Sequence, residues 1–143
     1  THSDYIDEIK KLLQSEYTDG RVVYLGNIPL QTMPEVNALA DIVMMPSLME
    51  AVSLSALEAM ATRAALVASD VGGLPEIVRH EQTGLLVPPR DPPAIAAALV
   101  RLGRDSQLRD QLAATGQQLA QEKYSWQAAA QKTLAFYKQL QTR

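Results

Sequence analysis

The chain contains no cysteine and only two histidines, His2 and His80, among its 143 residues. The lack of cysteine excludes disulfide bonds, thiolate catalysis and cysteine-ligated zinc, and two histidines are too few for a histidine-rich metal site. Aromatic residues make up only 5% of the chain. Alanine, leucine, valine and isoleucine must therefore fill any core.

The sequence also has no large excess of positive or negative charge and no long apolar run. The net charge is -3, and the lysines and arginines form no basic block, which argues against a nucleic-acid partner. No apolar run approaches the ~20 residues of a membrane-spanning helix, and no secretory leader is recognisable. The chain is 47% apolar and 20% charged, a balance typical of a globular domain or part of one. We therefore expect a cytoplasmic protein.

The first two thirds of the chain alternate between short apolar strands and helices. Strands are predicted at residues 21–25, 41–45, 65–69 and 84–87. Helices are predicted at residues 3–15, 32–40, 53–62 and 72–78. The helix over 53–62 has Ser53 as a suitable N-cap and is expected to pack through Leu54, Leu57 and Ala61.

Beyond residue 90 the pattern is helical. Asp91 is a suitable N-cap for a first helix, and Leu108, Leu112 and Leu119 mark a second. In the first of these, the residues expected to face inward are Ile95, Leu99 and Leu102. Ser125 is suited to cap a third helix, whose apolar stripe we expect to pack in the core. That stripe consists of Trp126, Ala130, Thr133, Tyr137 and Leu140.

Strands that are apolar throughout, alternating with helices, are typical of a parallel sheet covered on both faces. The predicted fold class is α/β, with a Rossmann-like doubly wound parallel sheet, right-handed crossovers and a helical C-terminal segment. Ligands of such sheets bind outside the carboxyl ends of the strands. Those ends lie at residues 26–27, 46–53, 69–73 and 87–91.

Two acidic residues, Glu50 and Glu58, flank the start of the helix predicted at 53–62. Glu50 lies in the preceding loop, and Glu58 projects from an early turn, so both can face one site above the sheet edge. A carboxylate accepts two hydrogen bonds at once, which suits paired sugar or ribose hydroxyls. The alternative is that both are solvated surface acids.

Gly72 and Gly73 begin another helix, where glycine lets backbone amides approach an anion closely. The alternative is a tight turn without a ligand. Arg79 and His80 follow this helix, but neither is close in sequence to an acid that would complete a nucleophilic triad.

The strongest pattern combines four segments with fixed spacing. They are Pro46-Ser47-Leu48-Met49-Glu50, Leu57-Glu58-Ala59-Met60-Ala61, Val67 to Val78 with Gly72-Gly73-Leu74-Pro75-Glu76 at its centre, and Gly84-Leu85-Leu86-Val87-Pro88. Together they closely resemble the donor-binding, C-terminal half of retaining GT-B glycosyltransferases of family 4, and Glu50 and Glu58 match the E-x7-E motif of that family. The resemblance covers about residues 20–137.

The resemblance implies transfer of a sugar from a nucleotide-sugar to an acceptor hydroxyl, with the anomeric configuration kept and no bound metal or other cofactor. Glu50 would be the catalytic-site acid that holds donor-sugar hydroxyls, and Glu58 would hold the ribose. The loop at the helix start would lie beside the diphosphate or the sugar. The donor-binding residues implied in addition to Glu58 are Pro46, Ser47, Ala51, Val52, Ser53, Leu54, Gly72 and Gly73.

The sequence departs from the family pattern in two ways. Ala51, Ser53 and Arg63 stand where the family usually has glycine. The acceptor domain and the first strands of the donor domain, with their diphosphate-binding arginine and lysine, are absent, so residues 1–143 are expected to form one partial domain. We expect the missing half in the same or another polypeptide, with a homo-oligomer as a further option. Any peripheral membrane contact would lie in that half.

Three other functions fit parts of the pattern. A non-catalytic nucleotide-sugar-binding or scaffold module would keep the fold without turnover. A phosphorylation-switched receiver domain needs an aspartate at the carboxyl end of a strand, whereas Asp41 begins its strand. A glycosidase also uses two carboxylates, but the alternating strands and the glycine pair fit a nucleotide donor better.

Overall fold

The computed structural model describes residues 7–9, 11 and 21–141, and the chain divides into two units, residues 1–32 and 33–143. In the first unit, residues 7–9 and 11 are helical; the rest of the helix predicted at 3–15 lies outside the described residues. Residues 21–25 have exposed side chains and no strand structure, so the strand predicted there is wrong. A strand needs a neighbour to pair its backbone amides and carbonyls, and no described strand pairs with this segment.

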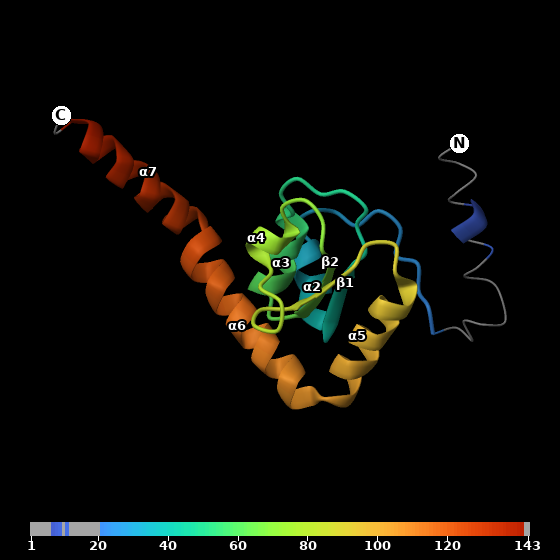
Figure 1. The fold of residues 1–143 in the computed structure, drawn as a ribbon. Helices are drawn as coiled ribbons and strands as arrows, with labels where there is room; N and C mark the ends of the chain where they lie inside the picture. Colours follow the sequence, from blue (N-terminus) through green and yellow to red (C-terminus); the bar gives the residue numbers. More distant parts are fainter. Residues whose placement is uncertain (1–6, 10, 12–20, 142–143) are drawn as a thin grey trace. The chain divides into compact units, whose positions relative to one another are not determined.

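A three-stranded parallel sheet lies at the centre of the second unit (Figure 1). Its strands are β1 (Ile42–Met45), β2 (Ala65–Ser69) and β3 (Leu85–Val87), arranged in chain order. The register places Ile42 opposite Ala65 and Val67 opposite Leu85. These strands confirm the three predicted in this region to within one residue at each end.

Helices connect the strands and form the C-terminal part of this unit (Figure 1). They are α2 (Met33–Leu39), α3 (Leu54–Ala61), α4 (Leu74–Ile77), α5 (Pro92–Arg104), α6 (Ser106–Tyr124) and α7 (Trp126–Gln141). Each corresponds to a predicted helix. The predicted caps are confirmed: Ser53, Asp91 and Ser125 each accept a hydrogen bond from the amide three residues later, at 3.3, 2.9 and 3.2 Å.

The two faces of β2 pack against different helices. Leu66 and Ala68 contact a cluster from α3, α4 and the second half of α6, while Ala65 and Val67 contact a cluster from α5 and the first half of α6. All five residues of β2 are buried. Helices on both faces of a parallel sheet are the doubly wound arrangement that the sequence predicts.

The buried face of α3 differs from the prediction. Ala56, Ala59 and Met60 are buried, whereas Leu54 is 66% exposed and Leu57 is only half-buried. Two of the three buried residues are alanines, and small side chains let the helix approach the sheet closely. The larger leucines line a hollow together with residues of α6 and the start of α7, and Leu57 also packs against the edge of the core cluster.

The apolar stripe of α7 is not part of a core, which corrects the prediction for Trp126 to Leu140. No described residue of α7 is buried, and Trp126 is 91% exposed. The helix contacts α6 and projects beyond the sheet (Figure 1). Both faces of the central strand β2 are already covered by α3 to α6, so α7 adds nothing to these two clusters. None of the described helices has the length and apolar character to span a bilayer.

Helix α3 ends in a Schellman motif. The amide of Ala64 donates to the carbonyl of Ala59 at 3.2 Å, and the amide of Arg63 donates to that of Met60 at 3.0 Å. Arg63 has a φ of 66°, a left-handed conformation that strains every residue with a Cβ. The position of Arg63 therefore favours glycine.

Replacing Arg63 with glycine is expected to raise the free energy of unfolding by about 1 kcal/mol, because the left-handed conformation costs an L-residue roughly 1–2 kcal/mol. Urea unfolding measures this as a higher midpoint with an unchanged slope. Arg63→Ala is the control, since it removes the guanidinium but keeps the Cβ. An equal gain in both variants would show that charge, rather than backbone strain, is responsible.

Candidate functional site

Loops from all three strands meet at one edge of the sheet, because the strands are parallel and their carboxyl ends point the same way. Residues 46–53 follow β1, residues 70–73 follow β2 and residues 88–91 follow β3. The amide of Asp70 donates to the carbonyl of Val87 at 2.8 Å, which joins the second loop to the end of β3. Three of the four predicted strand-end loops are thus brought to one edge of the sheet; the fourth, residues 26–27, follows no strand and belongs to the other unit, so that prediction is wrong.

The Gly72-Gly73 turn packs directly on the loop that contains Glu50. The amide of Gly73 donates to the carbonyl of Glu50 at 3.1 Å. A Cβ on Gly72 would lie 1.7 Å from the carbonyl oxygen of Glu50, and a Cβ on Gly73 would lie 2.1 Å from that of Ala51. The group that approaches the two glycines closely is therefore the backbone of residues 50–51.

Ser53 connects this loop to α3 and is only 2% exposed. Its hydroxyl oxygen accepts the amide of Ala56 and lies 3.9 Å from the sulfur of Met45. The hydroxyl therefore holds the start of the helix in place. The other loop positions of the predicted site are open to solvent: Pro46, Ala51 and Val52 are exposed, and Ser47 and Glu50 are half-buried.

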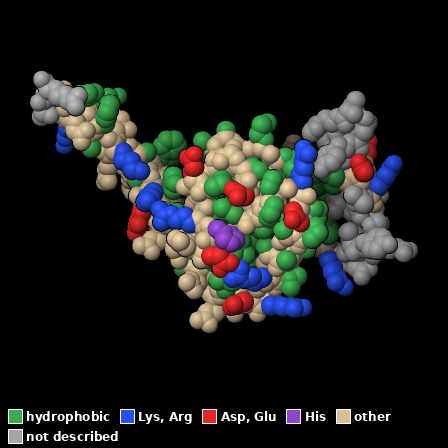
Figure 2. Space-filling model, viewed as in Figure 1, with side chains coloured by type: hydrophobic (Ala, Val, Ile, Leu, Met, Phe, Trp, Pro, Cys, Tyr) green, Lys and Arg blue, Asp and Glu red, His purple; other side chains and the backbone are tan. Residues whose placement is uncertain are grey.

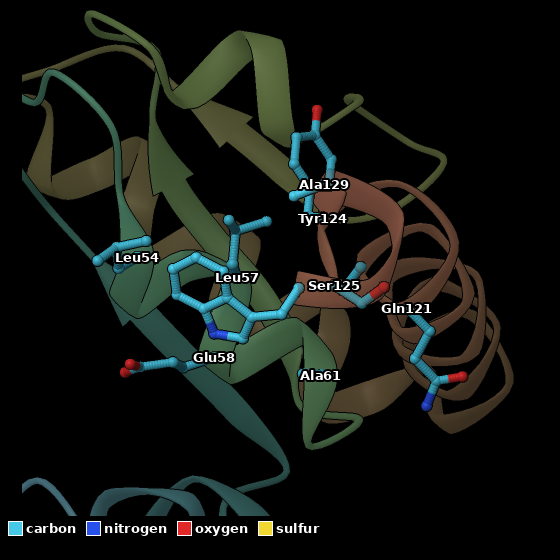
Figure 3. Close-up of a pocket in the computed structure, with 10 residues that line it drawn as sticks. Leu54, Leu57, Glu58, Ala61, Gln121, Tyr124, Ser125 and Ala129 are labelled. Carbon is cyan, nitrogen blue, oxygen red and sulfur yellow. The ribbon is translucent and has the colours of Figure 1, made fainter. Parts of the chain in front are cut away.

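Glu58 lies on α3 at the rim of a hollow of about 510 Å³. The hollow is lined mainly by apolar side chains of α3, α6 and the start of α7: Leu54, Leu57, Ala61, Ala120, Tyr124, Trp126 and Ala129, with Gln121 and Ser125. In Figure 3 the Glu58 carboxylate is directed away from Tyr124 and Gln121 of α6. Glu50 does not line this hollow. The convergence of Glu50 and Glu58 on one ligand stays a prediction.

The sequence does not predict the hollow beside Glu58 as a site. The family resemblance implies that Leu54 binds the donor, whereas the helical spacing of Leu57 and Trp126 indicates packing. One sequence signal could have indicated this hollow. Ser125 ends α6 and caps α7, and the single tryptophan of the chain, Trp126, comes directly after it, so its side chain lies outside the core.

A second polar cluster lies beside β3 and is engaged in protein contacts. Arg101 donates to both carboxylate oxygens of Glu81, and these hydrogen bonds lower the pKa of Glu81 from its usual value. His80 accepts the amide of Leu86 at its Nδ1 atom, at 2.9 Å, and its Nε2 atom lies 3.8 Å from Glu81. The imidazole nitrogen that would serve as a base is thus occupied by the backbone of the edge strand.

Charges are spread widely over the described surface. In Figure 2, lysine and arginine side chains stand apart over the visible face and gather in no single patch. Among the described residues there is no group of three or more acidic, histidine or cysteine side chains placed to hold a metal ion. The candidate site is the edge with Glu50 and the glycine pair, where the loops that follow β1 and β2 are hydrogen-bonded to each other.

Comparison with known proteins identifies the family. The model of the family described as glycosyl transferases group 1 matches residues 3–105. The chain belongs to this family. An uncharacterized glycosyltransferase of Methanocaldococcus jannaschii is 36% identical over 135 residues, which are 94% of this chain and 34% of the relative.

Solved structures show the same fold as this group 1 glycosyltransferase chain. Sucrose-phosphate synthase from Thermosynechococcus elongatus has 34% identity and a TM-score of 0.84, with 95% of this chain and 34% of that chain covered. HepE from Anabaena, solved in complex with UDP, has 24% identity and a TM-score of 0.87, with 96% and 37% covered. These neighbours are GT-B glycosyltransferases. The chain spans about a third of the length of the relatives it matches.

Proposed function

We propose that this chain forms the donor-binding part of a retaining glycosyltransferase that transfers a sugar from a nucleotide-sugar to an acceptor hydroxyl, without a bound metal, in the cytoplasm. Glu50 holds hydroxyls of the donor sugar, and Glu58 holds the ribose. Ala51, Val52 and the start of α3 line the diphosphate or the sugar. The proposal extends to Pro46, Ser47 and Leu54 as neighbouring contacts.

One observation carries the proposal: the loop with Glu50 lies at the carboxyl edge of a parallel sheet, directly before the helix that bears Glu58. Open parallel sheets bind ligands at this edge. Both acids are half-exposed and thus accessible to a ligand. Family membership supports the reaction class, and the UDP and UDP-glucose complexes of HepE, which shares the fold, support a nucleotide-sugar as donor.

The described site cannot supply the whole catalytic effect. Enzymes lower activation barriers by roughly 8–23 kcal/mol, whereas a helix N-terminus contributes about 0.3–2 kcal/mol toward an anion. A diphosphate leaving group needs cations close to it. We propose that these cations and the acceptor site are supplied by the remaining two thirds that the relatives possess, in the same or another polypeptide.

Replacing Glu58 with glutamine in the full-length protein is expected to weaken nucleotide-sugar binding by about tenfold, the scale of a charge-assisted hydrogen bond to ribose. Glutamine keeps the size of the side chain but loses the charge. Calorimetric titration with UDP-, GDP- and ADP-sugars measures the effect and identifies the base. Glu122→Gln, on the exposed side of α6, is the matched control.

An unchanged affinity in Glu58→Gln would remove Glu58 from the site. Binding without any transfer in the full-length protein would favour the second candidate, a non-catalytic nucleotide-sugar-binding module. Ala51 is the feature that favours this candidate, because a Cβ beside a diphosphate restricts backbone approach.

A further inference from the structure

The contacts of Gly72 and Gly73 point to a different role from anion binding. We propose that the two glycines are positioning residues: they fix the backbone of Glu50 and so determine how its carboxylate meets the donor sugar. The inference rests on the proposed function of Glu50 and deepens it. It also assigns to the amide of Gly73 no contact with the diphosphate.

The amides of Gly73, Leu74 and Glu76 are already engaged. The amide of Gly73 donates to Glu50, that of Leu74 donates to the carbonyl of Val71 at 3.1 Å, and that of Glu76 donates to the carbonyl of Gly73 at 3.2 Å. Pro75 has no amide hydrogen. Helix α4 itself is only 4 residues long. From Gly73 to Glu76, no amide is therefore left to receive a phosphate oxygen.

The same contacts hold the Glu50 loop from one side. The Cα atoms of Gly72 and Gly73 occupy the space beside the carbonyls of Glu50 and Ala51, with no room for a Cβ on either glycine. Gly72 has a φ of 53°, which turns the chain so that the amide of Gly73 reaches Glu50. Two consecutive peptide groups of the loop are thereby fixed, and with them the direction in which the Glu50 side chain leaves the backbone.

Fixing this direction matters because a carboxylate that binds sugar hydroxyls must be held within about 0.5 Å of its binding position. The carboxylate of Glu50 is half-exposed and free to reach a ligand, so its placement depends on the backbone below it. The glycine pair should therefore affect the affinity for the sugar group more strongly than the affinity for the nucleoside diphosphate.

The test compares Gly73→Ala with wild type in the full-length protein. UDP, GDP and ADP and the corresponding glucose derivatives are titrated by calorimetry, and the ratio of the two dissociation constants reports the contribution of the sugar. We expect Gly73→Ala to lower this contribution about tenfold, the scale of one charge-assisted hydrogen bond, with a clearly smaller loss of diphosphate affinity. Gly103→Ala is the matched control, since a Cβ there meets nothing within 4 Å.

Glu50→Gln in the same background tests whether the glycine acts through Glu50. The double variant should lose no more of the sugar contribution than Glu50→Gln alone, because residues that act as a unit are not additive. Additive losses would overturn the inference. So would a comparable loss of diphosphate affinity in Gly73→Ala. Wild-type protein that binds neither ligand would instead contradict the proposed function.

Amide exchange provides a test that needs no variant, in case Gly73→Ala does not fold. The amide of Gly73 should exchange slowly in the free protein and keep its chemical shift when the nucleoside diphosphate is added. Rapid exchange that becomes slow only with the diphosphate would show that this amide binds the ligand, and would overturn the inference.

Discussion

Replacing Gly72 with alanine is expected to lower the free energy of unfolding by about 3 kcal/mol or more. Two effects add at this position. The left-handed conformation, with a φ of 53°, costs an alanine roughly 1–2 kcal/mol. The new Cβ would also lie 1.7 Å from the carbonyl oxygen of Glu50, and a backbone atom cannot rotate away as a flexible side chain can.

Two other glycines separate these effects. Gly26 has a φ of 67°, but a Cβ added there would meet nothing within 4 Å, so Gly26→Ala tests the left-handed conformation alone. Gly103 has neither constraint and lies in α5, where alanine is expected to raise stability by about 0.5–1 kcal/mol. Thermal or urea unfolding of the three variants gives the order. A loss for Gly72→Ala no larger than that for Gly26→Ala would show that the Glu50 loop yields easily.

The predicted strands in the centre of the chain are confirmed because they carry a local signal that the sheet also requires. Residues 65–69 are apolar almost without interruption, and β2 is buried on both faces. Residues 21–25 carry a similar signal but form no strand. Pairing depends on a neighbouring strand, and the sequence of one segment does not contain that information.

Which side of a helix is buried is harder to predict from the sequence than where the helix begins and ends. The prediction for α3 favours the larger apolar residues as the buried face, while the sheet contacts the small ones, Ala56 and Ala59. The stripe of α7 has the spacing of a core helix, but both faces of β2 are already covered by other helices. Periodicity gives the face of a helix, and only the rest of the fold decides whether another element covers it.

The candidate site shows a similar limit. The sequence predicts that Glu50 and the glycine pair follow the ends of strands, and the structure confirms that placement. The sequence does not reveal that Gly73 donates its amide to Glu50, since that contact joins residues from two different loops. A glycine pair before a helix has the same sequence pattern whether it faces a phosphate or a protein carbonyl.

The packing of β2 leads to the second large effect, an expected loss of about 3 kcal/mol on replacing Leu66 with alanine. Leu66 is completely buried in the strand at the centre of the sheet. A Cβ on Gly84 would lie 2.7 Å from the carbonyl oxygen of Leu66, so the backbone beside it is already tightly packed. The cavity left by the lost side chain cannot close by a small backbone shift, and the full cost should appear as a lower unfolding midpoint.

Leu134→Ala makes the matched control for Leu66→Ala, because it deletes the same atoms from the exposed helix α7. Leu134 is 55% exposed, so the change in unfolding free energy should stay within about 0.5 kcal/mol. Alanine also has the highest helix propensity, which offsets part of any lost contact. If Leu134→Ala lowered the free energy of unfolding of the 143-residue chain as much as Leu66→Ala, Leu134 would have to be buried. The exposure of α7 would then be contradicted.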